Sequence, residues 1–337
     1  MRRSLLRLSI PLREPFVTSA GVVSARDLAV IRLEDDEGTL GFGEAAPLEA
    51  YDGVTVDEVI DALRDGPPAR GAPPQARAAW ELAELDLQAR RRGRSLGEPG
   101  ADAIPVNLTL SAGPPDEVAE AASAGVKAGY SCFKVKVGLP DDHARVGAVR
   151  EAVGSWPALR VDANGAWTPD EAVRAIVALS EHDLELVEQP CATLEEMAEV
   201  VAQVEVPVAA DESIVGVDDV HRAVELVACD AVNVKLSAAG GFGPARDALR
   251  GAREAGLSAW LSSTLDGPWG IAAALQLAAG QHIPLACGLA TLDLFDARIA
   301  KALPPPINGL MAVPQGPGLG VEVSDDALAE VLVEEVR

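Results

Sequence analysis

The chain has 337 residues, and its 28 Lys and Arg against 52 Asp and Glu give a formal net charge of −24. This length predicts about two domains at roughly 150 residues each, and the negative charge argues against nucleic acid as a partner, because a nucleic-acid surface needs a basic stripe. An anionic small-molecule substrate fits the composition because a local site can oppose the global charge, and no apolar run reaches the roughly 18 residues that indicate a membrane span.

The first hundred residues are typical of a small α+β unit. The segment Leu28–Glu44 predicts two strands joined by a turn at Asp35–Gly38. Helical spacing of apolar residues follows at Thr55–Arg64 and Pro74–Arg92. Strands followed by helices indicate an α+β arrangement, which we expect over residues 1–98.

Short apolar runs alternate with amphipathic helical stretches from residue 104 onward. The eight runs occupy residues 104–110, 132–138, 159–164, 184–190, 207–213, 231–237, 257–264 and 284–290. Eight strands that alternate with single helices predict a (β/α) barrel, which we expect over residues 99–318. An acidic helix at Ser324–Glu335 lies in the remaining segment, 319–337, which we expect to pack on the barrel or on the first domain.

Ionisable residues stand at the ends of five consecutive predicted strands. They are Lys136, Asp162, Glu188, Asp211 and Lys235, spaced 23 to 26 residues apart. Active sites of such barrels lie where the strands end. A lone lysine there is commonly solvated and a lone carboxylate commonly caps the next helix, but the regular spacing argues against these explanations for the whole set.

The three carboxylates predict a metal site. Asp162, Glu188 and Asp211 end adjacent strands, which lie about 5 Å apart in a sheet. An all-oxygen site suits Mg²⁺, or alternatively Mn²⁺, rather than zinc.

The histidines and cysteines stand apart from this set. For each histidine, a surface or packed position is favoured over a role as a metal ligand; they are His143, His182, His221 and His282. The cysteines are widely spaced, without a Cys-x-x-Cys pair; they are Cys132, Cys191, Cys229 and Cys287. They predict buried, reduced thiols in a cytoplasmic protein.

Lysine is rare in this chain, with only five among the 28 basic residues. Lys134 and Lys136 are two residues apart and share one side of their strand, which we expect to face inward. Adjacent ammonium groups disfavour each other's charge and lower a lysine pKa, which suits a general base. In such a site a metal can bind a substrate carboxylate, and a lysine can remove the proton from the neighbouring carbon. The combination predicts proton abstraction through an enediolate.

The motifs resemble the enolase superfamily, in particular its muconate-lactonizing-enzyme subgroup. The matching pieces are Lys134-Val-Lys136, Val161-Asp162-Ala-Asn164, Val187-Glu188-Gln-Pro190, Ala210-Asp211-Glu-Ser213, Val234-Lys235 and Gly41–Pro47. The resemblance covers essentially the whole chain. It implies an α/β fold with a modified (β/α)8-type barrel, of the enolase-like (β/α)7β form, and an N-terminal α+β capping domain.

The end of the barrel resembles the o-succinylbenzoate synthase family at Leu261–Thr264 and Gly288–Leu294. The resemblance implies a lyase of menaquinone biosynthesis. Its reaction is a metal-dependent syn dehydration of 2-succinyl-6-hydroxy-2,4-cyclohexadiene-1-carboxylate to o-succinylbenzoate. The last predicted strand, Leu285–Leu289, lacks the Asp-x-Asp with which dipeptide epimerases hold a free α-amino group.

Residue roles follow from the same resemblance. Lys136 is expected to act as base and then as acid, Lys134 to tune it, and Lys235 to stabilise the enediolate. Substrate contacts are expected from Asn164, Ser262, Ser263 and Gly288. The loops at residues 16–21 and 48–53 are expected to close over the site.

Other functions remain open from the sequence. An N-acylamino acid racemase or a cycloisomerase of the same subgroup would use the same lysines and carboxylates. A Schiff-base aldolase acting through Lys235 has no use for the three carboxylates, and a barrel kept only as a structural or binding protein would not need the full set. The oligomeric state is not predicted, although a monomer is compatible with the sequence.

Overall fold

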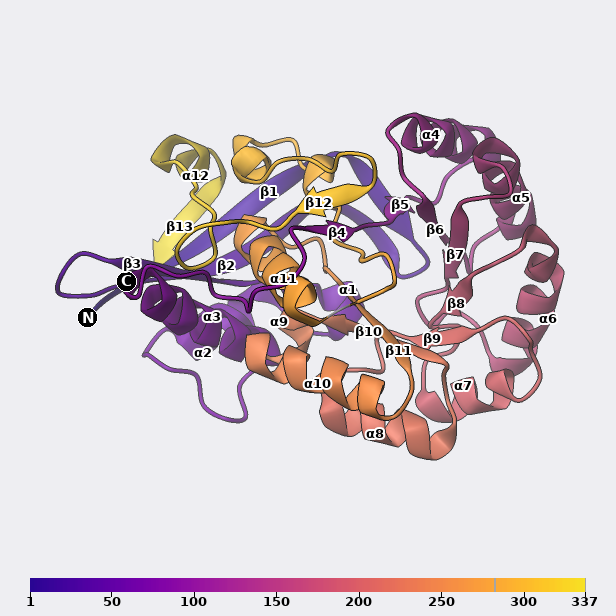
Figure 1. The fold of residues 1–337 in the computed structure, drawn as a ribbon, viewed down its shortest axis with the longest axis horizontal. Coiled ribbons are helices and arrows are strands. Elements are labelled where there is room, and N and C mark those ends of the chain that lie inside the picture. Colours follow the sequence, from indigo (N-terminus) through magenta and orange to yellow (C-terminus); the bar gives the residue numbers. More distant parts are fainter. Residues whose placement is uncertain (282, 337) are drawn as a thin grey trace.

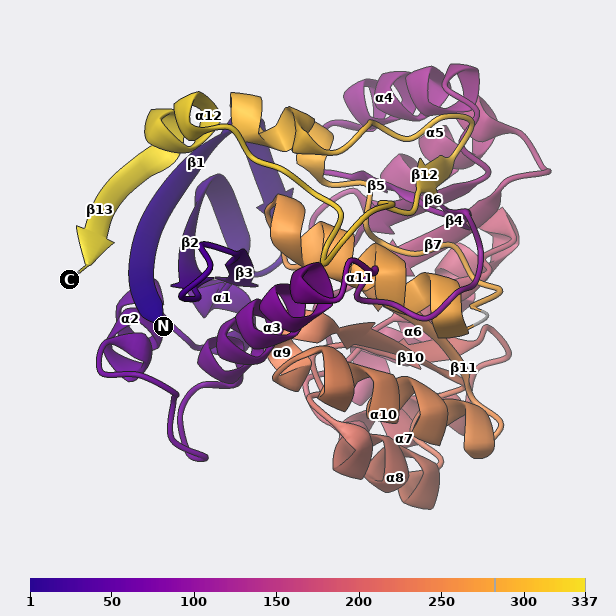
Figure 2. The same ribbon diagram turned by 60° about the vertical axis from the view of Figure 1, so that its left-hand side comes forward.

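The computed structural model describes residues 1–281 and 283–336. A curved parallel sheet covered on its outside by helices lies beside a twisted antiparallel sheet formed mainly by the N-terminal residues (Figures 1 and 2). The predicted α/β fold, a modified barrel with an N-terminal α+β unit, is confirmed. His282 lies outside the described residues. No helix in the described part of the chain is long and apolar enough to cross a bilayer.

The antiparallel part, called the cap below, contains four strands among the residues that the structure describes, in the order β13-β1-β2-β3. The strands are β1 (Arg2–Thr18), β2 (Gly21–Glu34), β3 (Leu40–Ala45) and β13 (Leu332–Val336), and the helices are α1 (Glu49–Asp52), α2 (Val56–Leu63) and α3 (Pro74–Arg91). Helix α3 lies so close to β3 that a Cβ at Gly43 would be 1.8 Å from the carbonyl oxygen of Ala79. Glycine is therefore required where this helix covers the sheet.

Within the described residues, the parallel sheet contains seven strands in the order β11-β10-β9-β8-β7-β6-β5. They are β5 (Leu108–Leu110), β6 (Cys132–Lys136), β7 (Ala158–Asp162), β8 (Leu186–Glu188), β9 (Val208–Ala210), β10 (Ala231–Lys235) and β11 (Ser258–Ser262). The intervening helices are α4 (Pro115–Lys127), α5 (Asp142–Val153), α6 (Pro169–Leu179), α7 (Leu194–Val201), α8 (Val217–Leu226), α9 (Leu236–Ala239), α10 (Phe242–Glu254) and α11 (Pro268–Gln281). Each predicted run from residue 132 to residue 264 therefore contains a strand.

The first and last predicted runs differ from simple barrel strands. The run 104–110 divides into β5 and β4 (Ala103–Pro105), and β4 pairs instead with β12 (Leu310–Ala312). The run 284–290 forms only single-residue bridges. Its Cys287 bonds to the backbone beside β5, and its Gly288 bonds to Leu261 of β11. This segment closes the barrel by joining its two open edges.

The C-terminal segment returns to the cap. Helix α12 (Asp325–Val331) ends four residues before the predicted end at Glu335, and the chain continues as β13, antiparallel to β1. The yellow C-terminal strand accordingly lies beside the indigo N-terminal strand (Figure 1). The expectation of a helix to Glu335 is wrong because the edge of the cap sheet offers backbone partners to these residues.

Helix α11 connects the cap to the barrel. It is buried along nearly its whole length, and its Trp269 stacks on Phe42 of β3 with ring centroids 5.7 Å apart. Just before it, Gly267 N donates to Oε1 of Glu44, another β3 residue, at 2.6 Å. These contacts fix the cap over one side of the barrel.

Raising the pH from about 5 to about 8 is expected to lower the free energy of unfolding through Glu44. Burial, followed by the charge of Asp266, raises the pKa of Glu44 from 4.5 to about 8. Between the unfolded and the folded pKa of Glu44, the folded chain binds more protons than the unfolded chain. The free energy of unfolding therefore falls as the pH rises, by at most ~1.4 kcal/mol per pH unit. Urea unfolding across this range measures the slope.

The control is Asp266→Asn, which keeps an oxygen for the hydrogen bonds from Thr264. Removal of the neighbouring charge lowers the pKa of Glu44, so the variant should lose less stability over the same pH range. An identical slope in the two proteins would contradict this assignment.

Candidate active site

The ionisable residues singled out in the sequence gather at one end of the parallel sheet. Lys136, Asp162 and Glu188 are direct partners across the neighbouring strands β6, β7 and β8. Asp211 follows the last residue of β9, and Lys235 ends β10. Parallel strand register therefore brings together side chains that lie about one βα unit apart in the chain.

Three carboxylates lie within reach of a single ion. One oxygen each from Asp162, Glu188 and Asp211 lies within 4.8 Å of the other two. All three residues are buried, with exposed fractions of 0%, 0% and 2%. Buried charges are costly unless they are paired or coordinate a metal. This all-oxygen set has the chemistry of a site for a hard divalent cation.

Both lysines of β6 point toward these carboxylates. Lys134 Nζ donates to Asp162 at 2.9 Å and to Glu188 at 3.0 Å. Lys136 Nζ donates to the same Asp162 oxygen at 2.7 Å and to Oδ1 of Asn164 at 2.9 Å. The expected inward orientation of both lysines is therefore observed.

The third lysine lies on the opposite side of the carboxylates. Lys235 Nζ donates to Asp211 and, at 2.9 Å, to the hydroxyl of Tyr51 from the cap. The same nitrogen lies 4.4 Å from the centroid of the Tyr51 ring. Three ammonium groups thus face three carboxylates, and the cap supplies one polar contact to this arrangement.

The pKa of Lys134 differs from the expectation for a lysine pair. Burial alone would lower it, but the carboxylates of Asp162 and Glu188 outweigh burial, and the pKa of Lys134 is raised. Burial likewise opposes ionisation of Asp162, yet Lys134 and Lys136 hold its pKa below the usual value. Burial dominates at Glu188 and raises its pKa to about 7. The prediction of a depressed lysine pKa is wrong at Lys134 because its ammonium group donates hydrogen bonds to the carboxylates of both Asp162 and Glu188.

A cavity of about 180 Å³ opens above the carboxylates between barrel and cap. The predicted contact residues Asn164, Ser262, Ser263 and Gly288 all line it. So do cap residues of the two expected loops and their surroundings: Phe16, Thr18, Ala20, Gly21, Leu48, Ala50 and Tyr51. The segment 16–21 is the tip of the β1–β2 hairpin rather than a separate loop.

The far wall of the cavity consists of small and hydroxylic residues. Ser262 Oγ is buried without a hydrogen-bond partner among the described residues. Ser263 shares a hydrogen bond of 2.9 Å with Thr291. A Cβ at Gly288 would lie 2.7 Å from that of Ser262, so glycine is required beside this serine. An unpartnered buried hydroxyl is costly and is available to a bound molecule.

Comparison with known proteins assigns this arrangement to a family. The sequence model described as "Enolase C-terminal domain-like" matches residues 117–327. An o-succinylbenzoate synthase of Thermobifida fusca is 37% identical over 332 residues, which cover 97% of this chain and 90% of the relative. The chain belongs to the enolase superfamily, in its muconate-lactonizing-enzyme subgroup.

Solved structures of other superfamily members share the whole architecture. The N-succinyl Arg/Lys racemase of Bacillus cereus superposes with a TM-score of 0.93 at 26% identity, covering 99% of this chain and 98% of that one. A dipeptide epimerase of Enterococcus faecalis, solved with Mg and the dipeptide L-Leu-L-Tyr, gives 0.86 at 28% identity, with coverage of 96% and 99%. The superfamily assignment makes this chain an enzyme, and its acidic triad can hold a divalent metal.

Several polar residues of this superfamily site were not identified from the sequence. Asn233 donates to Glu188 at 2.9 Å, and Asn164 donates to Glu212 at 2.8 Å. Asn233 lies two residues before Lys235 on β10, so strand alternation places both side chains on one side of the strand. This spacing could have identified Asn233 as a residue of the site. Tyr51 lies in the expected loop 48–53, but its bonds to Lys235 and Asp211 join distant parts of the chain and carry no comparable local signal. The same holds for the bond between Glu212 and Asn164.

Proposed function

We propose that the chain is an o-succinylbenzoate synthase, which converts 2-succinyl-6-hydroxy-2,4-cyclohexadiene-1-carboxylate to o-succinylbenzoate and water. The observation that carries the proposal is the 37% identity to the Thermobifida fusca enzyme over nearly the whole chain. The cavity supports it, since the segment Leu285–Leu289, where a dipeptide epimerase would carry Asp-x-Asp, lines it with Gly288 and carries no carboxylate. This assignment places the enzyme in menaquinone biosynthesis and in the cytoplasm.

Lys136 acts as the base in this proposal. Its amine takes the proton from the carbon next to the substrate carboxylate, and the same group then gives a proton to the departing hydroxide, so that water leaves. Lys134 tunes Lys136, and Lys235 faces the ring from the opposite wall and stabilises the developing negative charge. Loss of water makes the ring aromatic, which drives the elimination.

Asp162, Glu188 and Asp211 hold the metal in this proposal, with Mg²⁺ as the expected ion and Mn²⁺ as the alternative. Their buried, all-oxygen donor set fits such a cation. When bound, the cation supplies Lewis-acid stabilisation of negative charge on the substrate carboxylate. Ser262, Ser263, Asn164 and Gly288 contact the substrate, and residues 1–98 act as the capping domain that covers it.

A direct absorbance assay for o-succinylbenzoate formation tests this function. The purified chain with Mg²⁺ and the cyclohexadiene substrate should form product in proportion to enzyme concentration. Absence of product above the uncatalysed rate, with correctly folded protein and metal present, would exclude the assignment.

The main rival is an N-acylamino acid racemase. The 0.93 TM-score to the Bacillus cereus racemase favours it, as does the position of Lys136 and Lys235 on opposite sides of the site. A racemase incubated with N-succinyl amino acids in D₂O would incorporate deuterium at the α-carbon. Rapid uptake without dehydration would replace the proposed function, and rapid uptake with dehydration would make the enzyme bifunctional.

Tyr51→Phe is expected to lower kcat/KM for the dehydration by about 10- to 100-fold. The change removes a hydroxyl that bonds to Lys235 and Asp211 at 2.9 Å each, and hydrogen bonds to charged groups contribute ~1.5–3 kcal/mol. The matched control is Tyr130→Phe, whose side chain lies outside the cavity. Equal kinetics for both variants would show that the Tyr51 hydroxyl has no role.

A further inference from the structure

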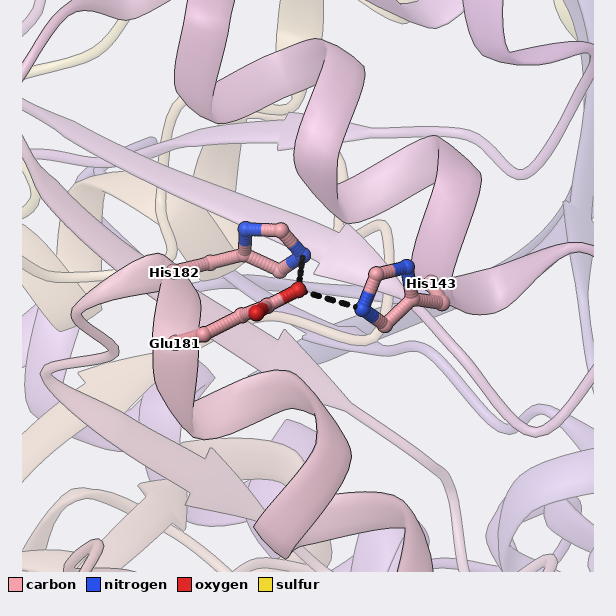
Figure 3. A group of neighbouring side chains, drawn as sticks. All are labelled: His143, Glu181 and His182. Carbon is pink, nitrogen blue, oxygen red and sulfur yellow. Dashed lines mark hydrogen bonds and ion pairs between the residues drawn. The ribbon is translucent and has the colours of Figure 1, made fainter.

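A second cluster of metal-ligand side chains lies on the helical layer outside the parallel sheet. His143 is the second residue of α5, and Glu181 and His182 belong to the short 3₁₀ helix Ser180–His182 that follows α6. Figure 3 shows the two imidazole rings on either side of the Glu181 carboxylate. None of the three residues lines the active-site cavity.

The spacing of the three donor atoms suits one small cation. Glu181 Oε1 lies 2.7 Å from His143 Nε2 and 3.8 Å from His182 Nε2, and one ligand atom from each residue lies within 4.8 Å of the others. Tetrahedral zinc with bonds of about 2.0–2.1 Å separates its ligand atoms by roughly 3.3 Å. The observed distances bracket this value, so small side-chain rotations bring all three donors to an ion.

His182 directs a ring nitrogen that could bind a metal toward the other two side chains of this cluster. Its Nε2 is buried and has no hydrogen-bond partner among the described residues. An unsatisfied buried nitrogen is costly, and a cation would satisfy it.

The surrounding residues hold the His182 ring in this position. Gly147 lies one turn after His143 on α5, and a Cβ there would be 3.2 Å from His182 Cε1. Arg150 directs its guanidinium to the carbonyl oxygens of His182 and Asp183, each at 2.8 Å. The guanidinium of Arg150 is thus hydrogen-bonded to the backbone. His143 and Glu181 are 57% and 63% exposed, which leaves an ion accessible from solvent.

We propose that His143, Glu181 and His182 bind one Zn²⁺ ion, with water as the fourth ligand. Two imidazoles and one carboxylate are a donor set for zinc and related transition metals, whereas Mg²⁺ prefers oxygen alone. The ion would connect α5 to the end of α6. This site is independent of the proposed dehydration and of the acidic triad.

Zinc titration of the untagged chain, in excess Mg²⁺ that occupies the acidic triad, tests the proposal. One equivalent of Zn²⁺ should bind, and the melting temperature should rise. Co²⁺ in its place should give the visible absorption of a four-coordinate ion. Binding weaker than roughly 0.1 mM, or octahedral Co²⁺ spectra, would overturn the proposal.

Two variants locate the ion, and a third serves as the control. His143→Ala and the isosteric Glu181→Gln should each weaken Zn²⁺ binding by about 100-fold or more, since even outer-shell changes cost 10- to 100-fold. His221→Ala removes an exposed histidine elsewhere and should leave binding unchanged. Unchanged affinity in both cluster variants would place the zinc at another position and refute the proposal.

Discussion

Lys136→Arg is expected to abolish nearly all dehydration while leaving the fold intact. The guanidinium keeps the positive charge beside Asp162 and Asn164, but it does not lose its proton in a protein. General acid–base catalysis contributes roughly 10²- to 10⁴-fold, and kcat should fall by about this factor. Single-turnover kinetics measure the loss, and circular dichroism verifies the fold.

Lys127→Arg is the matched control for this substitution. Lys127 is exposed at the end of α4. Replacement of its ammonium group by a guanidinium group should therefore leave kcat unchanged. Lys136→Arg activity above about a tenth of that of the unaltered chain would remove Lys136 from the role of base. The base would then have to be another group near the cavity, with Lys235 the first to examine.

The gathering of the candidate site residues at one end of the sheet was predictable because it depends on local patterns repeated along the chain. Each βα unit ends its strand at the same level of the barrel, so equal sequence spacing becomes spatial proximity. The pairing of Lys136 with Asp162, and of Asp162 with Glu188, shows this register directly. Strand alternation then places Lys134 beside Lys136 without further information.

The cap could not be predicted to the same extent because its contacts join distant parts of the chain. Strand β1 has an irregular register between Pro11 and Phe16, which interrupts the alternation that signals a strand. Strand β13 forms by pairing with a strand more than three hundred residues earlier. Its own acidic sequence favours a helix, and the available sheet edge overrides that preference.

The electrostatics of the site likewise depend on tertiary distances. The sequence showed two neighbouring lysines and suggested mutual repulsion, whereas Lys134 lies 2.9 Å from Asp162 and 3.0 Å from Glu188. The opposite charges of these carboxylates at this separation outweigh burial and raise the pKa of Lys134. Proximity of His143 and His182 was also invisible in the sequence, since they come from different helices.

Removal of divalent metal by EDTA is expected to lower dehydration by roughly 10²- to 10⁴-fold, because Lewis-acid stabilisation contributes several kcal/mol. The three ammonium groups facing Asp162, Glu188 and Asp211 neutralise the carboxylates, so the fold should persist without the metal. Circular dichroism with and without EDTA shows whether the fold persists when the activity is lost.

Readdition of Mg²⁺ or Mn²⁺ without zinc should restore the dehydration, since the proposed reaction uses only the metal held by the acidic triad. The His143→Ala variant should lose and regain activity in the same way, which separates the triad from the surface cluster. Asp211→Asn removes one of the three carboxylates and should raise the Mg²⁺ concentration needed for half-maximal rate. Full activity of the unaltered chain in EDTA would show that no metal is needed. The lysine ammonium groups of the site would then stabilise the enediolate by themselves.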